Sequence, residues 1–198
     1  MNTPKTLIFV GRSGAGKGTQ LQLLKAFLEQ QNGGVAIRSL DMGSIYRDFF
    51  AKDGYVQEIA RDLSMNQGKF QPDFLTNALF VSHAVTFIDG TSHVVIDGFP
   101  RSIAQLQIVK DLLAYTKRAN PTVINIEVSR EEVKKRMLAR GRGDDSSEKI
   151  DSRLDEYDRA VVPMLEAMKH DSSLTYVEIN GEPDVDTIHK DLIAKLGF

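Results

Sequence analysis

The chain of 198 residues contains neither cysteine nor tryptophan, and only 8% of its residues are aromatic. Without cysteine it can form no disulfide, thiolate zinc site, iron–sulfur cluster or cysteine nucleophile. Its formal charge of −2 excludes binding to a polyanion through bulk charge, so we expect no nucleic-acid partner. The apolar run before Gly11, residues 6–10, is too short for a signal peptide or a membrane span. We therefore expect a cytoplasmic protein with no membrane attachment.

Short β-branched runs alternate with longer amphipathic segments along most of the chain. The alternation predicts an α/β fold with a parallel five-stranded sheet covered by helices on both faces. In such a sheet, ligands bind at the carboxyl ends of the strands. We expect one domain over residues 1–198, with strands at residues 6–10, 35–37, 94–96, 123–126 and 176–179.

Two intervals interrupt the alternation. Residues 40–75 contain short helical pieces around three glycines and no strand pattern, which predicts a small helical insertion. Residues 140–146 break one helix and offer Asp144, Asp145 and Ser146 as caps for the next. We expect this second interval to form a short surface loop.

The glycine-rich segment 11–19 directly follows the first predicted strand and opens a predicted helix. Its glycines let the backbone wrap around a phosphate, the helix N-terminus adds partial positive charge, and Lys17 adds a full charge. The general phosphate-loop motif has Ser or Thr directly after the lysine, whereas here Gly18 precedes Thr19. A plain strand-to-helix turn is the alternative, but it needs neither so many glycines nor the lysine. The segment therefore predicts a phosphate site.

Two charged residues follow the third predicted strand. Asp97 is placed to hold water around a Mg²⁺ ion that bridges nucleotide phosphates, and a turn or capping aspartate is the less favoured alternative beside a phosphate loop. Arg101 lies just past Pro100, where it would reach the same cleft.

Four arginines follow the fourth predicted strand. Arg136 and Arg140 share one face of a predicted helix, Arg142 follows in the loop, and Arg153 lies on the next helix. Solvated helix faces with local salt bridges are one interpretation. Because a phosphate site lies nearby, we favour a clamp that neutralises charge on a transferring phosphoryl group.

Together these motifs resemble the nucleoside monophosphate kinase family, and most closely a bacterial adenylate kinase with a short lid. The anchors are residues 14–20, residues 97–101 with Gln105, Arg136 with Arg140, and residues 142–145 with Arg153. In that family Gly-Thr after the lysine is normal. The resemblance implies a P-loop fold and reversible phosphoryl transfer from ATP·Mg to AMP, giving two ADP, by a monomer. It also makes residues 40–75 the monophosphate-binding insertion and residues 140–146 a minimal lid.

The resemblance also assigns roles to individual residues. It implies catalytic roles for Lys17, Arg101, Arg136, Arg140, Arg142 and Arg153. It implies ATP binding by Gly14, Ala15, Gly16, Lys17, Gly18, Thr19, Arg136 and Arg140. It implies AMP binding by Met42, Arg47, Lys69, Phe70, Gln71, Gly98, Phe99, Pro100, Arg101, Gln105, Arg142 and Arg153. Mg²⁺ would be held mainly by phosphates and water, with Asp97 and Thr19 acting through water.

Some positions depart from the family pattern. Met42 replaces a threonine near the acceptor base, Ser13 replaces a proline, and residues 41–47 also resemble bacterial cytidylate kinases. A pyrimidine monophosphate kinase and a non-catalytic nucleotide-binding module therefore remain alternatives, with Gln105 as the main reason to favour AMP. Only Gly141 separates Arg140 from Arg142, which leaves no room for the zinc ligands of a longer lid. We expect no zinc.

Overall fold

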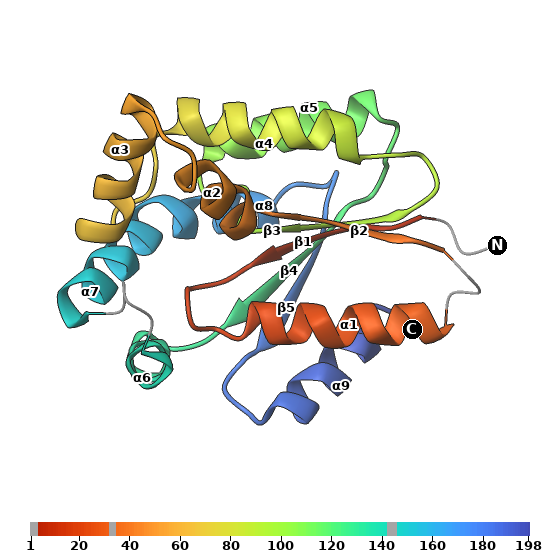
Figure 1. Ribbon diagram of the computed structural model, residues 1–198. Coiled ribbons are helices and arrows are strands. Elements are labelled where there is room, and N and C mark those ends of the chain that lie inside the picture. The colour runs from red at the N-terminus through yellow and green to blue at the C-terminus, as the bar shows by residue number, and fades with distance from the viewer. Residues whose placement is uncertain (1–3, 32–34, 142–145) are drawn as a thin grey trace.

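The computed structural model describes residues 4–31, 35–141 and 146–198 (Figure 1). Within these residues the strands form one parallel sheet of five strands, in the order β2-β3-β1-β4-β5. The predicted fold class is confirmed. The strands are β1 (Thr6–Val10), β2 (Ile37–Asp41), β3 (His93–Asp97), β4 (Thr122–Glu127) and β5 (Thr175–Asn180).

Burial explains which strands could be located from sequence. The central strand β1 is fully buried, and its neighbours β3 and β4 are nearly so, which matches their continuous apolar runs. The prediction for the second strand, residues 35–37, was wrong because β2 runs from Ile37 to Asp41. β2 pairs only with β3 among the described strands and forms an edge of the sheet, so it can contain the polar residues Arg38 and Ser39. These polar residues interrupt the apolar run from which a strand would be predicted.

Helices cover both faces of the sheet (Figure 1). Helices α2, α4, α5 and α8 pack on one face, and α1 and α9 pack on the other. Buried side chains of α6 and α7 continue the second layer beyond the carboxyl ends of the strands. The α-helices are α1 (Lys17–Gln31), α2 (Met42–Phe50), α3 (Tyr55–Arg61), α4 (Asp73–Phe87), α5 (Ile103–Tyr115), α6 (Arg130–Arg140), α7 (Ser147–Glu156), α8 (Val162–Lys169) and α9 (Val185–Lys195). The π-helical segments are η1 (Asp62–Asn66) and η2 (Tyr157–Val161).

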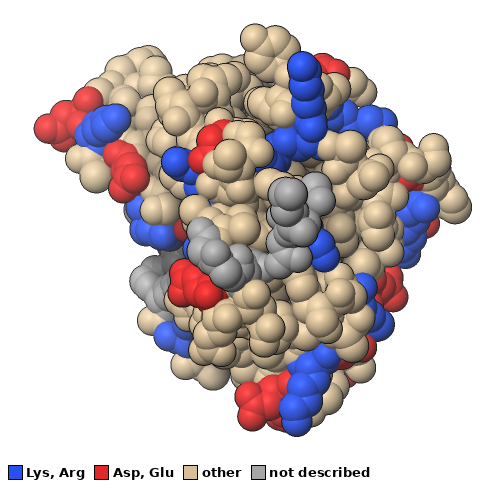
Figure 2. Space-filling model, turned by 90° about the vertical axis from the view of Figure 1, so that its right-hand side faces the viewer, with Lys and Arg blue, Asp and Glu red and all other residues tan. Residues whose placement is uncertain are grey.

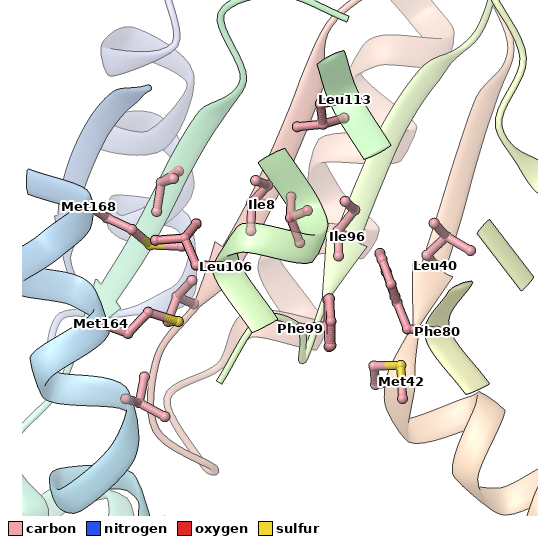
Figure 3. Close-up of a cluster of buried hydrophobic side chains, with 14 of the residues drawn as sticks. Ile8, Leu40, Met42, Phe80, Ile96, Phe99, Leu106, Leu113, Met164 and Met168 are labelled. Carbon is pink, nitrogen blue, oxygen red and sulfur yellow. The ribbon is translucent and has the colours of Figure 1, made fainter. Parts of the chain in front are cut away.

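Alternate residues of each strand supply the two layers of the core. In β1, Ile8 belongs to the layer beneath α4 and α5, whereas Leu7 and Phe9 belong to the layer beneath α1 and α9. Figure 3 shows the first layer, in which Phe80 of α4 stacks on Phe99 at a centroid distance of 3.9 Å. This stacking fixes the loop after β3 against α4.

The two interrupted intervals have distinct local structure. Within residues 40–75, α2, α3 and η1 follow β2, and a small third cluster of Phe50, Ala60 and Leu75 holds this region to the start of α4. In the second interval, α6 ends at Arg140 and Ser146 caps α7 by accepting a hydrogen bond from the Lys149 amide. Residues 142–145, including Asp144 and Asp145, lie outside the described residues, so the minimal lid stays a prediction.

The amino-terminal ends of the strands are joined by a buried arginine. The guanidinium of Arg118 donates to the Thr6 hydroxyl and to the carbonyls of Lys5, Asp89 and Ser92, at 2.7–3.2 Å. The Lys5 ammonium also lies 4.0 Å from the ring centroid of Phe198.

Figure 2 shows the side of the molecule that lies at the right in Figure 1. On this side, cationic and anionic side chains are interspersed among uncharged ones. Across the described segments, no helix is both long and apolar enough to span a membrane.

Candidate active site

The loop between β1 and α1 has a backbone that only glycine can adopt at key positions. Gly11 and Gly14 have φ values of 147° and 85°. A Cβ atom at Gly11 would lie 2.6 Å from the Ile126 carbonyl oxygen, and one at Gly14 would lie 2.9 Å from Met137 Cγ. The loop is therefore packed closely against β4 and α6, and α1 begins directly after it. This arrangement brings a closely wound main chain and a helix N-terminus to one location, as a phosphate site requires.

Lys17, the first residue of α1, lies at the centre of this location. Its ammonium donates hydrogen bonds to the carbonyls of Gly11 at 2.8 Å and Arg12 at 3.1 Å. Burial lowers the pKa of Lys17, and the positive charges of Arg101 and Arg140 lower it further, while Asp97 and Asp41 oppose the shift. An added anion would relieve this concentration of positive charge.

Asp97 ends β3 beside Asp41, which ends β2, because the two residues pair in register. One carboxylate oxygen of Asp97, Oδ1, is buried and has no hydrogen-bond partner among the described residues. Burial raises the pKa of Asp97, as does the charge of Asp41, whereas Lys17 and Arg101 act in the opposite direction.

A buried carboxylate oxygen without a partner fits a hydrated Mg²⁺ ion, because that ion keeps most of its water ligands. The described residues contain no group of three side chains that could cage a metal directly. Thr19, the other predicted metal neighbour, is exposed in the first turn of α1. The positions of these two residues are compatible with contact to such an ion through water.

Arg101 is positioned by three neighbouring groups. Its Nε donates to the Gly98 carbonyl at 2.9 Å, its guanidinium carbon lies 4.8 Å from the Phe70 ring centroid, and its backbone N–H donates to Gln105 Oε1 at 2.7 Å. Gln105 is buried on α5, and its Nε2 donates to Asp73 at 2.6 Å. A preformed network therefore holds the guanidinium beside the phosphate loop.

One pocket brings together segments that lie far apart in the sequence. It joins the phosphate loop and the residues after β3 to the insertion and to α7 with η2. The lining residues include Gly11, Ser13, Lys17, Phe70, Gly98, Pro100, Arg101, Arg153 and Tyr157. Lys17, Arg101 and Arg153 therefore face one cavity, as expected if they act on a single anionic ligand.

The other described arginines of the predicted site are not among the residues that line this pocket. Arg140 ends α6 close enough to Lys17 to influence its pKa. Arg47 contacts the Asp41 carboxylate at 3.4 Å and has a side chain that is 66% exposed. Arg136 binds the carbonyls of Gly181 and Glu182 after β5, at 2.9 and 3.3 Å. Arg142 lies outside the described residues.

Several residues predicted to bind AMP have side chains that are used elsewhere. Met42 and Phe99 are fully buried in the core shown in Figure 3. Gln71 is also buried and donates to the Ala60 carbonyl at 2.7 Å, inside the insertion. Lys69 is exposed. In this conformation Met42 and Phe99 expose no surface to a nucleotide, and the Gln71 side chain is bound to the Ala60 carbonyl.

Sequence reasoning missed three residues of this region. Tyr157 lines the pocket, and its position four residues after Arg153 on a helical segment was a usable signal. Asp158 accepts from Arg12 at 2.8 Å and from Arg130 at 3.1 Å, which links the phosphate loop to α6 and η2. Asp73 contacts Gln105 from 32 residues away, and no local pattern indicated that contact.

A parallel sheet with a glycine-rich phosphate loop after its central strand, and with lysine and arginines facing one pocket, defines a P-loop protein for a phosphorylated ligand. Comparison with known proteins identifies the family. The family model described as adenylate kinase matches residues 9–173.

Curated relatives match nearly the whole chain. "Adenylate kinase 1" of Nostoc sp. strain PCC 7120 is 32% identical over 191 residues, which cover 96% of this chain and 98% of that protein. An adenylate kinase of Prochlorococcus marinus strain MIT 9515 is 32% identical over 97% of this chain and 98% of its own length. One from Leptospira biflexa is 31% identical over 97% of this chain and its full length. This chain belongs to the adenylate kinase family.

Proposed function

We propose that this chain is an adenylate kinase that transfers the terminal phosphoryl group of ATP to AMP, reversibly, and so yields two ADP. The observation that carries the proposal is the single pocket in which Lys17, Arg101 and Arg153 meet. Three cationic side chains from three separate segments suit a phosphoryl group that carries charge while it moves between two nucleotides. Family membership supports the choice of ATP and AMP.

In this proposal the phosphate loop, residues 14–19, binds the phosphates of ATP with Lys17, while Arg136 and Arg140 complete the ATP side. Arg47, Arg101, Arg142 and Arg153 surround the acceptor phosphate and the phosphoryl group in transfer. The acceptor needs no general base, because its attacking atom is a phosphate oxygen that is already ionised at neutral pH. Catalysis then rests on positioning and charge neutralisation by these side chains.

Asp97 and Thr19 would hold water ligands of a Mg²⁺ ion that arrives with ATP. When bound, the ion neutralises charge on the nucleotide phosphates. The unpartnered Oδ1 of Asp97 supports this role, since a water ligand of the ion would supply its missing hydrogen bond.

We further propose that residues 40–75 bind the acceptor nucleotide and that residues 140–146 act as a minimal lid. The small third cluster of Phe50, Ala60 and Leu75 holds the outer part of the first segment, whereas Met42 and Ile45 of α2 belong to the main core. We also propose that the protein is a monomer and that it is located in the cytoplasm.

A coupled assay of ATP consumption with AMP, CMP, UMP, dTMP and GMP tests the proposed function. We expect the highest kcat/KM with AMP, and the Lys17→Met variant should lose most of this activity. A faster reaction with CMP or UMP would instead identify a pyrimidine monophosphate kinase. ATP binding without transfer to any of the five nucleotides would identify a non-catalytic module.

A further inference from the structure

The side-chain amide of Gln105 is held at both ends by groups that determine its orientation. Its Oε1 accepts the backbone N–H of Arg101 at 2.7 Å, and its Nε2 donates to Asp73 Oδ1 at 2.6 Å. A backbone N–H can only donate, and an ionised carboxylate can only accept. If the Gln105 amide were flipped, its NH₂ group would face the Arg101 N–H and its carbonyl oxygen would face the Asp73 carboxylate. Neither pair could form a hydrogen bond. The amide therefore has one stable orientation.

Asp73 is itself fixed in place. Its second oxygen accepts from the Ser102 hydroxyl at 3.0 Å, and that hydroxyl accepts from the Gln105 backbone N–H at 3.2 Å as the cap of α5. These contacts close a ring that joins the start of α4 to the start of α5. Gln105 is only 3% exposed, so a flipped amide would leave polar groups unpaired and away from water.

The fixed amide keeps part of its hydrogen-bonding capacity. Nε2 carries two hydrogens and Oε1 has two lone pairs, and the contacts with Asp73 and Arg101 use one of each. One donor and one acceptor remain, in a set spatial order. Adenine and cytosine present an amino donor beside a ring-nitrogen acceptor, whereas hypoxanthine and uracil present an oxo acceptor beside a ring N–H. Only one of these two patterns can match a fixed amide.

We propose that Asp73 is a specificity-determining positioning residue, which fixes the orientation of the Gln105 amide so that the acceptor site selects amino-bearing bases over oxo-bearing bases. The inference rests on the proposed function, in which AMP is the acceptor, together with the family resemblance that places the acceptor base next to Gln105. Asp73 itself contacts neither the base nor the reacting atoms.

The test compares acceptors that differ only at the base edge that carries either an amino or an oxo group beside a ring nitrogen. The pairs are AMP with IMP, and CMP with UMP. The variant is Asp73→Asn, which has the same shape but can accept or donate. The matched control is Asp186→Asn, which removes the same charge from the first turn of α9. Values of kcat and KM are measured for each acceptor at saturating ATP, and thermal unfolding checks the fold of each variant.

We expect Asp73→Asn to lower the AMP-to-IMP ratio of kcat/KM about tenfold, since a group that can both donate and accept loses selectivity for hydrogen-bonding partners. The change should lie in the KM of the acceptors, with the KM of ATP and the kcat with AMP near wild type. Asp73→Ala, which also removes the acceptor oxygen, should lower the ratio in the same direction. Asp186→Asn should keep the wild-type ratio.

A ratio within twofold of wild type in both Asp73 variants would overturn the inference. An equal loss with AMP and IMP, together with a raised KM for ATP, would also overturn it, because that pattern indicates a merely structural residue. Should the wild type prefer CMP, the proposed acceptor is wrong, and the CMP-to-UMP ratio decides the inference by the same criterion. Should the wild type phosphorylate no acceptor, the proposed activity is wrong, and the same ratios are read from calorimetric binding constants.

Discussion

At the scale of single residues, Arg101 shows how the fold prepares a charged side chain before any ligand arrives. The Gly98 carbonyl and the Phe70 ring orient its guanidinium, and Gln105 fixes its main chain. Holding the side chain in this way reduces the entropy that would be lost when it binds an anion. The guanidinium also lines the same pocket as Lys17, so an anion bound there would meet both positive charges.

Arg101→Ala is expected to lower kcat about 10²–10³-fold, because the variant loses a preorganised cation that stabilises charge in the transition state. ATP binding, measured by calorimetric titration, should persist, since the phosphate loop remains intact. Arg159→Ala serves as the control, because Arg159 is an exposed arginine of η2 that pairs with Glu156 at the end of α7. An unchanged kcat in Arg101→Ala would remove Arg101 from the mechanism.

At the scale of elements, ion pairs join helices that the sequence separates widely. Lys110 of α5 donates to Asp171, which follows α8, at 2.6 Å. Hydrogen bonds from Lys110 and Ser173 lower the pKa of Asp171 to about 2. The contact helps to hold two helices of the same layer together on the sheet.

This pair makes stability depend on pH in a defined direction. Because the folded-state pKa of Asp171 lies below its ordinary value of 3.8, the stabilisation is present above that value and is lost as the pH falls toward about 2. Asp171→Asn should therefore lower the free energy of unfolding at about pH 6, with a smaller difference from wild type at about pH 3. Urea unfolding at the two pH values measures this difference. A difference that is the same at both pH values would contradict the assignment.

At the scale of the whole molecule, the sequence predicted what depends on local pattern. Continuous apolar runs located β1, β3 and β4, and the glycine-rich segment located the phosphate loop. The edge strand β2 was misplaced because its polar residues break the pattern that buried strands follow. The contact of Asp73 with Gln105 could not be predicted, because it depends on how α4 packs beside α5.

The far end of the molecule should affect stability but not activity. Arg118→Met leaves four buried or partly buried acceptors without their donor, and we expect it to lower the free energy of unfolding by about 3 kcal/mol. At 25 °C the kcat should equal that of wild type, because Arg118 contacts the amino-terminal ends of the strands, opposite the pocket. Chemical denaturation and a kinetic assay on the same sample measure the two quantities. A lowered kcat in folded protein would show that the two ends are coupled.

The contact of Lys5 with Phe198 has a practical consequence for engineering. Residues near the beginning and the end of this chain lie together, on the side of the sheet away from the pocket. A short linker could connect them in a circularly permuted chain without crossing the nucleotide site. New termini opened between α2 and α3, at the exposed residues 51–53, could then carry fluorophores that report movement of the insertion.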